Sequence, residues 1–590
     1  MIHTLKALGG MQVAPHHLAA QAGRDVLRDG GNAVEAMVAA AAAIAVVYPH
    51  MNAIGGDGFW LIHEPGKAPV AIDACGPAAA LATPDFYAGL DTIPPRGATA
   101  ALTVAGTIGG WDRALQVASA WGPALPLTRL LQDAIRHAHD GVAVTTSQSA
   151  LTRDKLPGLK DAPGFAQTYL VNGQPPEPGH VLRQPALGRT LAQLAERGLD
   201  DFYRGELAQR IGAELERVGS PVRTSDLAAY RAQIVEPLAV RLNDSTVYNL
   251  PPPTQGLSAL MILGLFERLG VTEGEGFAYL HGLVESTKRA FRVRERVVTD
   301  PQRLPADPRS FLTPEALDEL AAQIDPARAL PWPDATKPGD TIWMGAIDRE
   351  GRAVSFIQSV YWEFGSGTVL QDTGICWQNR GTSFSLDPKA LNSLKPGHKP
   401  FHTLNPSMAL FDDGRVMPYG TMGGEGQPQT QAAVFTRYAR FGNSLQQAVT
   451  APRWLLGRTW GDVSTTLKLE QRFDPALVQA LRDAGHAVEL LPEDFSDTMG
   501  HAGALVRRLP GLSRSGDLPL RLSRPPCAHG RLRSPARRPA HRGPARADRA
   551  LPDRTRRISD VPLCLRHVQG GRRPLFLAYH GADGGRRALS

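Results

Sequence analysis

The stretch that decides the fold runs from residue 337 to residue 362 and reads KPGDTIWMGAIDREGRAVSFIQSVYW. Two of its segments, 341–348 and 352–362, are rich in Ile, Val, Phe, Trp and Tyr, which favour strands. The short polar segment 349–351 separates them and ends in glycine. The pattern predicts a β-hairpin that begins directly after a Pro-Gly-Asp segment.

The length of the loop determines which residues of this hairpin face each other. A three-residue loop over 349–351 requires a left-handed residue at its end, and Gly351 can adopt that conformation without strain. In that register Thr341 faces Ser359, whereas a two-residue loop would place Gln358 opposite the threonine. We therefore expect the three-residue loop.

Thr341 has the chemistry of a nucleophile that supplies its own base. If the Asp340–Thr341 bond were cut, the new α-amino group, with a reference pKa of roughly 7.7–8, would lie beside the threonine hydroxyl and act as general base. Ser359 would be within hydrogen-bonding reach across the hairpin. The pair Gly423 and Gly424 offers backbone N–H groups to a tetrahedral oxyanion. Together these residues predict a hydrolytic or acyl-transfer site.

Each of these features has an ordinary structural explanation when it is taken alone. Threonine is common at the start of a strand, serine on a strand is usually hydrogen-bonded within the sheet, and Gly-Gly pairs mostly form turns. The combination gains weight because the motifs of other sites are missing. The sequence has no HExxH, no CxxC, no GxxxxGK[ST] and no GxSxG.

The rest of the chain adds helices to this hairpin. Helical spacing of apolar residues is present in four segments: 17–28, 33–47, 257–269 and 277–297. The second is apolar nearly all round, which predicts a buried helix, and Asn32 can cap it. Four prolines and no periodicity mark 325–339 as a linker.

Composition places the chain among globular proteins. Its 590 residues are 43% hydrophobic and 21% charged, which excludes a disordered or fibrous protein and predicts more than one ordinary core. The longest strongly apolar run, 36–47, is too short to span a bilayer, and the first dozen residues lack the apolar stretch of a signal peptide. We expect a soluble cytoplasmic protein with no membrane partner.

The net charge of +7 is unevenly distributed. Residues 507–590 contain 20 Arg, 5 Asp, no Lys and no Glu, a net charge of +15, which leaves −8 for residues 1–506. Such a basic segment can bind phosphates, but it has few aromatic residues and no periodicity, so we expect no nucleic-acid partner. We interpret 507–590 as a disordered extension or as the product of a reading-frame shift near 507–515.

From about residue 10 to residue 506 the chain resembles the gamma-glutamyltranspeptidase family of N-terminal-nucleophile hydrolases. The resemblance rests on landmarks in the family's order: GGNAVEA (30–36), PH (49–50), IGGDGF (54–59), PPPTQG (251–256), DT (340–341), FGSG (364–367) and GG (423–424). It implies an α+β fold, a four-layer αββα sandwich, in a proenzyme that cleaves itself between Asp340 and Thr341. The products would be a large subunit (1–340) and a fragment from Thr341 onward, in which 341–506 are the small subunit and 507–590 an atypical tail. In that family the residue matching Thr341 attacks an amide, and water or an amine releases the acyl group.

The substrate pocket departs from the pattern of enzymes that handle γ-glutamyl groups. Those enzymes hold the α-carboxylate with an arginine, and the matching stretch 73–77 has none. The acidic residue that holds the α-amino group has become Ser383, and Arg380 has appeared nearby. Tyr361 replaces an asparagine, and His402-Thr403 replaces a pair of serines.

A pocket without both charged groups is a poor site for a free α-amino acid, since each lost charge pair costs a few kcal/mol. Arg380 instead can donate two parallel (bidentate) hydrogen bonds to a carboxylate, and Tyr361 and His402 add bulk and hydrogen bonds. The pattern most resembles the branch that contains oxamate amidohydrolases, which split oxamate to oxalate and ammonia in purine degradation. We expect a small-molecule amide substrate of this kind. Arg380 could instead pair with a structural aspartate, and His402 could be a buried structural residue.

Three other interpretations stay open. A γ-glutamyl hydrolase or transferase would need a new anchor, for which Arg96 or Arg113 is available. An acylase acting on the side-chain amides of larger molecules would need a wider pocket. An inactive, unprocessed protein would result if the unusual C-terminal segment removes a strand of the sheet. The threonine mechanism requires neither metal nor cofactor, so we expect none.

Overall fold

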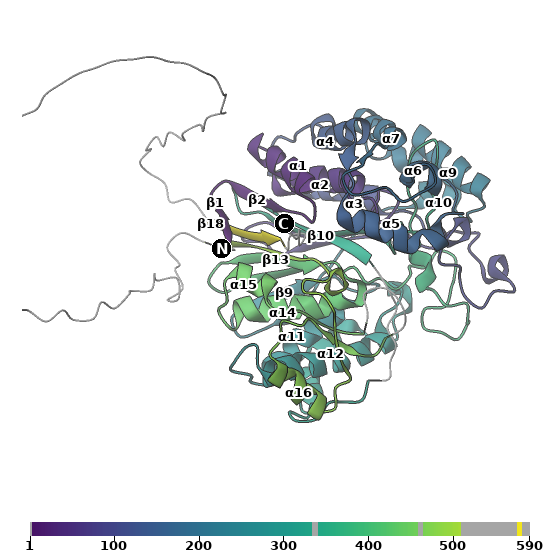
Figure 1. The fold of residues 1–590 in the computed structure, drawn as a ribbon. Helices are drawn as coiled ribbons and strands as arrows, with labels where there is room; N and C mark the ends of the chain where they lie inside the picture. The colour runs from purple at the N-terminus through teal and green to yellow at the C-terminus, as the bar shows by residue number, and fades with distance from the viewer. Residues whose placement is uncertain (1–2, 333–339, 458–463, 509–574, 581–590) are drawn as a thin grey trace, which may run out of the picture. The chain divides into compact units, whose positions relative to one another are not determined.

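The computed structural model describes residues 3–332, 340–457, 464–508 and 575–580 of the chain. Sixteen α-helices and eighteen strands are assigned within these ranges, all in one structural unit. None of the described helices is both long enough and apolar enough to cross a membrane. The chain therefore forms a mixed fold of helices and sheets (Figure 1).

The largest sheet in the described part of the chain has seven strands in the order β1-β18-β17-β13-β12-β9-β8. These strands are β1 (Leu5–Ala7), β18 (Leu575–His580), β17 (Ala502–Arg508), β13 (Val416–Thr421), β12 (Ser407–Phe411), β9 (Ser245–Asn249) and β8 (Leu238–Arg241). A second sheet has the order β2-β10-β11-β3-β4-β7. Its strands are β2 (Gly10–Val13), β10 (Asp340–Asp348), β11 (Ala353–Tyr361), β3 (Asp57–His63), β4 (Val70–Ala74) and β7 (Gln233–Val235). The small sheets combine β14 (Trp454–Leu456), β15 (Leu467–Leu469) and β16 (Val488–Leu490), and β5 (Val142–Ala143) with β6 (Val181–Leu182).

Helices lie on both sides of these strands, with α1–α7, α9 and α10 on one side, where α8 contacts α9, and α11, α12, α14 and α16 on the other (Figure 1). The first group comprises α1 (His17–Arg28), α2 (Ala33–Val47), α3 (Thr107–Ala118), α4 (Leu127–Asp140), α5 (Thr146–Leu159), α6 (Phe165–Tyr169), α7 (Pro185–Arg197), α8 (Asp201–Arg204), α9 (Glu206–Val218) and α10 (Thr224–Ala229). The others are α11 (Gly256–Arg268), α12 (Phe277–Val297), α13 (Pro314–Ala321), α14 (Gln427–Ala439), α15 (Leu445–Thr450) and α16 (Pro475–Asp483).

Strand β10 is buried on both faces, which explains its nearly continuous apolar sequence. Alternate residues of a strand point to opposite faces. Ile342 and Met344 belong to the core that contains helix α2. Trp343 and Ile347 belong to a separate core with Leu505 of the seven-stranded sheet. The two main sheets therefore share an apolar interface in which β10 is central.

The predicted hairpin is confirmed, and so is its loop. Residues 342–347 pair with 358–353 in the expected register, and Gly351 is left-handed with φ of +87°. The register shifts between Asp340 and Ile342, so the ladder is irregular at Thr341. The pairing of Thr341 with Ser359 is therefore absent from the regular ladder.

The four predicted helices are also confirmed, as α1, α2, α11 and α12. The side chain of Asn32 accepts from the backbone N–H groups of Val34 and Glu35, and the Glu35 side chain accepts from the N–H of Asn32, which forms a capping box. All residues of α2 are buried, as its uniformly apolar sequence predicts. Residues 325–332 of the predicted linker contain no helix or strand, and 333–339 lie outside the described residues.

The C-terminal segment contributes to the seven-stranded sheet in two places. Strand β17 extends to Arg508, and β18 lies between β17 and β1, antiparallel to both. The remainder of 507–590 lies outside the described residues, so its disorder or origin in a frame shift stays a prediction for those positions.

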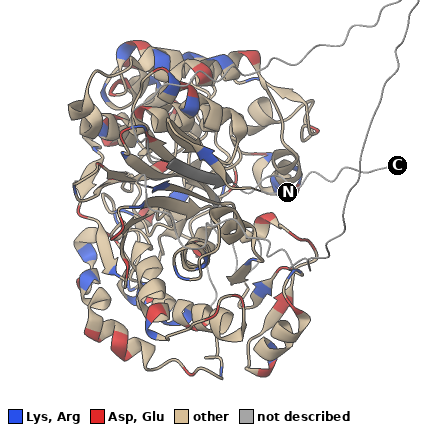
Figure 2. Cartoon of the chain, turned by 90° about the vertical axis from the view of Figure 1, so that its left-hand side faces the viewer, with Lys and Arg blue, Asp and Glu red and all other residues tan. Residues whose placement is uncertain are grey.

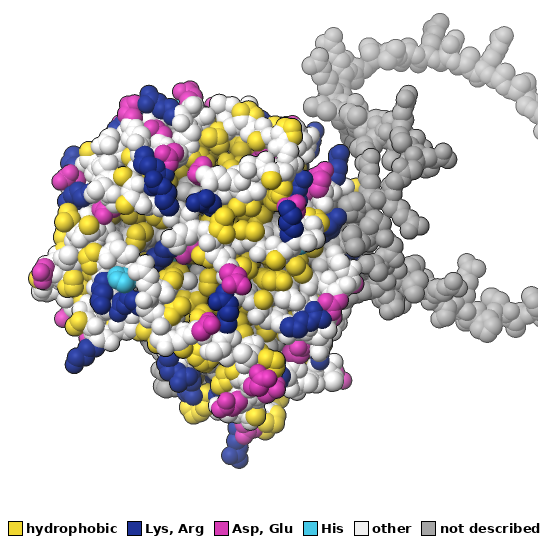
Figure 3. Space-filling model, turned by 180° about the vertical axis from the view of Figure 1, so that it is seen from behind, with side chains coloured by type: hydrophobic (Ala, Val, Ile, Leu, Met, Phe, Trp, Pro, Cys, Tyr) yellow, Lys and Arg dark blue, Asp and Glu magenta, His cyan; other side chains and the backbone are white. Residues whose placement is uncertain are grey.

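Charged side chains of both signs are interspersed over the helices (Figure 2). The face seen in Figure 3 mixes both signs with apolar side chains. That face shows no stripe of one sign among the described residues, the feature that a nucleic-acid surface would present.

Candidate active site

Thr341 is the second residue of β10 and is completely buried. Its neighbours in the ladder are the pairs Asp340–Tyr361 and Ile342–Gln358, between which the register shifts. The threonine therefore lies at an irregularity of a central strand. Such irregularities re-aim a side chain relative to the regular pleat.

Ser359 is buried on the adjacent strand β11, where it pairs with Asp57 of β3. Its Oγ accepts a hydrogen bond of 2.8 Å from the backbone N–H of Tyr361. This contact supports the left-handed conformation of Tyr361, whose φ is +85°. The role of Ser359 toward the threonine hydroxyl or amine stays a prediction.

The Gly423-Gly424 pair forms a turn between β13 and α14. Both residues are left-handed, with φ of +117° and +48°, so the turn requires residues without a side chain. The carbonyl oxygen of Gly423 accepts from the N–H of Gly426 at 2.7 Å. The turn leads into the N-terminus of α14, where backbone N–H groups favour negative charge.

Arg380 is a completely buried cation near the hairpin. Its Nη2 donates to Thr403 Oγ1 at 3.1 Å, and its guanidinium carbon lies 3.5 Å from the centroid of the Tyr361 ring. Among the described residues, Nε and Nη1 have no hydrogen-bond partner. Burial lowers the pKa of Arg380 to about 10, so the group is charged at neutral pH. A buried cation with unsatisfied donors is suited to bind an anion.

Ser383 shares the 3₁₀ turn Arg380–Ser383 with this arginine. Its buried Oγ has no hydrogen-bond partner among the described residues. With Arg294, Phe401 and Glu425, it lines a small cavity of about 70 Å³. The predicted residues Tyr361, Arg380, Ser383 and Thr403 are thus connected by contacts or by a shared turn.

His402 is bonded to a carboxylate that the sequence analysis did not identify as part of the site. Its Nε2 lies 3.2 Å from Asp57 Oδ2, and its Nδ1 accepts from the N–H of Leu404 at 3.4 Å. Because Nδ1 accepts, the proton of the neutral ring is on Nε2 and is donated to Asp57. Burial and the charge of Arg380 hold the pKa of His402 well below its usual range, which keeps the ring neutral.

Asp57 connects several segments of the site. Its Oδ1 accepts from the N–H groups of Gly76 and Gly106, both at 3.1 Å, and from Gln378 Nε2 at 3.0 Å. Burial raises the pKa of Asp57 to about 7, although these hydrogen bonds and Arg380 act in the opposite direction. Asp57 is part of the landmark IGGDGF, but its contact with His402 joins residues 345 positions apart and has no local signal in the sequence.

The two arginines proposed as anchors for a γ-glutamyl group have other partners. Arg96 Nη1 donates to the carbonyl oxygens of Glu363 and Gly365, and its guanidinium lies over the Trp362 ring. Arg113 donates to the carbonyl oxygen of Ala232 and to a neighbouring glutamine. Both contacts support a structural role for these arginines.

Two buried groups within the described residues bring three possible metal ligands within 4.8 Å of one another. In Asp57, Cys75 and His402, the carboxylate already accepts the hydrogen bonds described above. In His281, Glu285 and His486, the carboxylate pairs with Lys288 at 2.7 Å, and the ammonium supplies the positive charge that a metal would bring. Neither group therefore needs a metal to compensate its carboxylate.

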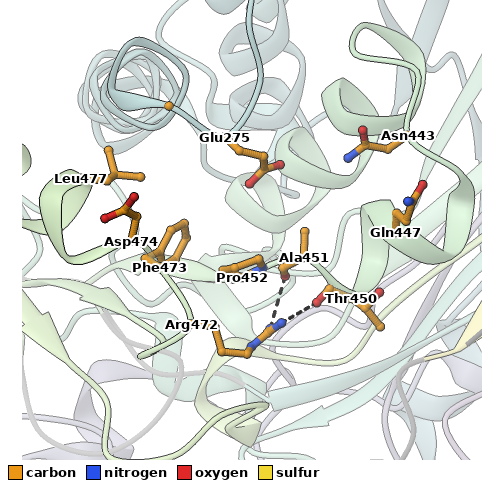
Figure 4. A pocket seen from close by; sticks show the side chains of 11 residues that line it. Glu275, Asn443, Gln447, Thr450, Ala451, Pro452, Arg472, Phe473, Asp474 and Leu477 are labelled. Carbon is orange, nitrogen blue, oxygen red and sulfur yellow. Dashed lines mark hydrogen bonds between the residues drawn. The ribbon is translucent and has the colours of Figure 1, made fainter. Parts of the chain in front are cut away.

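A larger hollow of about 560 Å³ lies away from these residues, around Glu275, Asn443 and Asp474 (Figure 4). Arg472 extends along its wall and donates to the carbonyl oxygens of Thr450 and Ala451. None of the predicted site residues lines this hollow.

The predicted amide-cleaving site would combine the buried threonine on a central strand, the turn of two left-handed glycines and the buried arginine. Comparison with known proteins specifies the family. The family model for gamma-glutamyltranspeptidase matches residues 19–517. The chain belongs to the gamma-glutamyltranspeptidase family and is a hydrolase of that family.

Individual relatives cover nearly the same length. The chain is 57% identical over 504 residues to the oxamate amidohydrolase proenzyme of Klebsiella pneumoniae, which covers 85% of this chain and 95% of that protein. It is 40% identical over 498 residues to the glutathione hydrolase-like YwrD proenzyme of Bacillus subtilis, with 84% and 94% covered. Among solved structures, cephalosporin acylase from Bacillus halodurans has a TM-score of 0.78 at 33% identity, with 86% and 93% covered.

Proposed function

We propose that the chain is a self-processing amidohydrolase that cleaves the amide of a small anionic acyl substrate, oxamate in the first instance. Cleavage between Asp340 and Thr341 would give a large fragment, 1–340, and a fragment that begins at Thr341, in which 341–506 form the small subunit. In this proposal the two main sheets and their flanking helices are the four layers of an αββα sandwich. The relatives described as proenzymes support the processing step.

The catalytic cycle uses groups of the chain itself. The α-amino group of Thr341 takes the proton of the threonine hydroxyl, and Oγ1 attacks the amide carbon. The negative charge that develops on the carbonyl oxygen is stabilised by backbone N–H groups of the Gly423-Gly424 turn, each contributing about 3–4 kcal/mol. The proton then passes to the leaving nitrogen, ammonia departs, and an ester to Thr341 remains. Water attacks this ester, which releases the acid and restores the hydroxyl.

The assignment of the substrate class rests on Arg380. It is fully buried and stacked on Tyr361, it has one hydrogen bond to Thr403, and its Nε and Nη1 lack partners among the described residues. A carboxylate would satisfy both donors, and such charge-assisted bonds are the strong ones. Oxamate carries one carboxylate directly attached to its amide, so this assignment requires the Arg380 donors to lie close to the scissile bond. The 57% identical relative is named for this substrate.

The test compares two substrates on purified protein. Ammonia release from oxamate is measured beside aniline release from a γ-glutamyl anilide, with Thr341→Ala as the inactive control. We expect turnover of oxamate at a kcat/KM at least 100-fold above that of the anilide. Turnover of the anilide alone would refute the small-anion pocket and favour a γ-glutamyl hydrolase.

A further inference from the structure

Gln255 and Arg294 join the glycine turn to Thr403, the hydrogen-bond partner of Arg380, through one buried chain of hydrogen bonds. Gln255 Nε2 donates to the carbonyl oxygen of Gly424 at 2.8 Å and to that of Thr403 at 2.7 Å. Arg294 Nη1 donates to Gln255 Oε1 at 2.9 Å. The same amide group therefore contacts both the turn and the residue that bonds to Arg380.

The orientation of this amide group is fixed by its surroundings. Gln255 is completely buried and Arg294 is 2% exposed. Because a guanidinium only donates, it requires the amide oxygen on its side, and the NH₂ group must then face the two carbonyl oxygens. Arg294 is itself held, since its Nη2 donates to Glu425 Oε2 at 2.9 Å and its guanidinium lies 4.0 Å from the Phe291 ring centroid.

The consequence for the turn follows from the planarity of the peptide unit. The Gly423 carbonyl is held by the N–H of Gly426, which fixes the plane that contains the N–H of Gly424. The Gly424 carbonyl is held by Gln255, which fixes the peptide plane on the other side of the Gly424 Cα and so limits rotation of the turn about Gly424. Glycine has the largest conformational freedom of any residue. Without these hydrogen bonds the backbone N–H groups of the turn could point in several directions.

We propose that Gln255 and Arg294 are positioning residues that keep the oxyanion donors and the carboxylate anchor in one fixed relation. The inference rests on the proposed function and deepens it. Both residues come from the segment 1–340, whereas Thr403, Gly424 and Glu425 come from 341–506. The chain of bonds therefore also connects the two proposed fragments across the site. A displacement of about 1 Å in such a constellation costs on the order of 100-fold in rate.

The test uses Gln255→Glu and Gln255→Met in the full chain. Both keep the approximate volume and remove the donors to the two carbonyls. Self-cleavage is measured on a denaturing gel, and kcat and KM are measured per cleaved molecule with the substrate that the wild type turns over fastest. We expect kcat to fall 10- to 100-fold. Arg294→Lys can keep the contact to Glu425 and lose the one to Gln255. Its kcat should therefore lie between that of the Gln255 variants and that of the wild type.

Arg437→Lys is the matched control, because Arg437 is 2% exposed, bonds to Glu275 at 2.6 Å and lines no part of the site. It should lower Tm as Arg294→Lys does but leave kcat within twofold. Loss of self-cleavage in both Gln255 variants at an unchanged Tm would also support the proposal, since the same donors serve that step. Cleaved Gln255 variants with kcat within twofold of the wild type would overturn it. A wild type that hydrolyses only the anilide would refute the oxamate assignment and still allow the Gln255 comparison.

Discussion

The guanidinium carbon of Arg380 lies 3.5 Å from the centroid of the Tyr361 ring, and Tyr361 has a left-handed backbone. The backbone N–H of Tyr361 donates a hydrogen bond to Ser359 Oγ on the same strand. A conformation that is unfavourable for an aromatic residue persists only where its surroundings fix it, and such positions concentrate at functional sites. The strained tyrosine thus links the strand next to the proposed nucleophile with the proposed anion site.

Removal of the Arg380 charge should weaken substrate binding. Two charge-assisted hydrogen bonds are worth about 3 kcal/mol or more, so Arg380→Met should raise KM for oxamate about 100-fold. The thioether side chain fills much of the same space, which preserves the packing on Tyr361. Steady-state kinetics with oxamate measure the effect. An unchanged KM in a protein with wild-type Tm would mean that Arg380 is a structural cation.

Asp57 should make substrate binding depend on pH. Burial raises its pKa to about 7, and Arg380, His402 and Cys75 are the titratable or charged groups that face it. Ionisation of Asp57 above pH 7 adds a negative charge near Arg380 and lowers the attraction for a carboxylate. KM for oxamate should therefore rise three- to tenfold between pH 6 and pH 8.5. The amine of Thr341 titrates in the same range, but its effect falls on kcat.

The matching variant is Asp57→Asn, which keeps an acceptor for the backbone donors and removes the titration. Its KM should be constant over the same range of pH. The raised pKa also determines how stability depends on pH. Between about pH 4 and pH 7 the folded protein keeps a proton on Asp57 that the unfolded chain has lost. The free energy of unfolding therefore falls progressively as the pH rises to about 7. Wild-type Tm should decline more over this interval than that of the variant. Equal slopes of Tm against pH would contradict the assignment.

Local patterns were sufficient for the parts of the fold that local chemistry determines. Strand-favouring residues on both sides of a polar loop, together with the glycine at 351, predicted the hairpin and its register. Helical spacing predicted α12 with the bounds that the structure has, Phe277–Val297. Asp57 and Gln255 were present only as letters of landmark motifs. Their roles depend on partners far away in the chain, His402 for one and Thr403 and Gly424 for the other. No periodicity or spacing encodes such contacts, because they exist only after the sheets have packed.

Replacement of Thr341 should separate folding from chemistry. Thr341→Ala removes the hydroxyl, so we expect a single uncleaved chain with no measurable ammonia release and a Tm close to that of the unprocessed wild type. Thr341→Ser keeps a hydroxyl and should cleave itself more slowly, then turn over substrate at a reduced rate. Denaturing gels and N-terminal sequencing of the small fragment measure both. Full activity in an intact chain would refute the mechanism.

Strand β18 should be required for a stable seven-stranded sheet. It pairs with β17 from Gly503 to Arg508 and with β1 from Leu5 to Ala7, so a chain that ends at Arg508 would leave both neighbours with unpaired backbone groups. Exposed strand edges promote association. Truncation after Arg508 should lower Tm and the soluble yield, whereas truncation after His580 keeps β18 and serves as the control. If the shorter chain matches the control in Tm, yield and self-cleavage, then β18 contributes nothing to the sheet, and the basic segment beyond β17 is dispensable for folding.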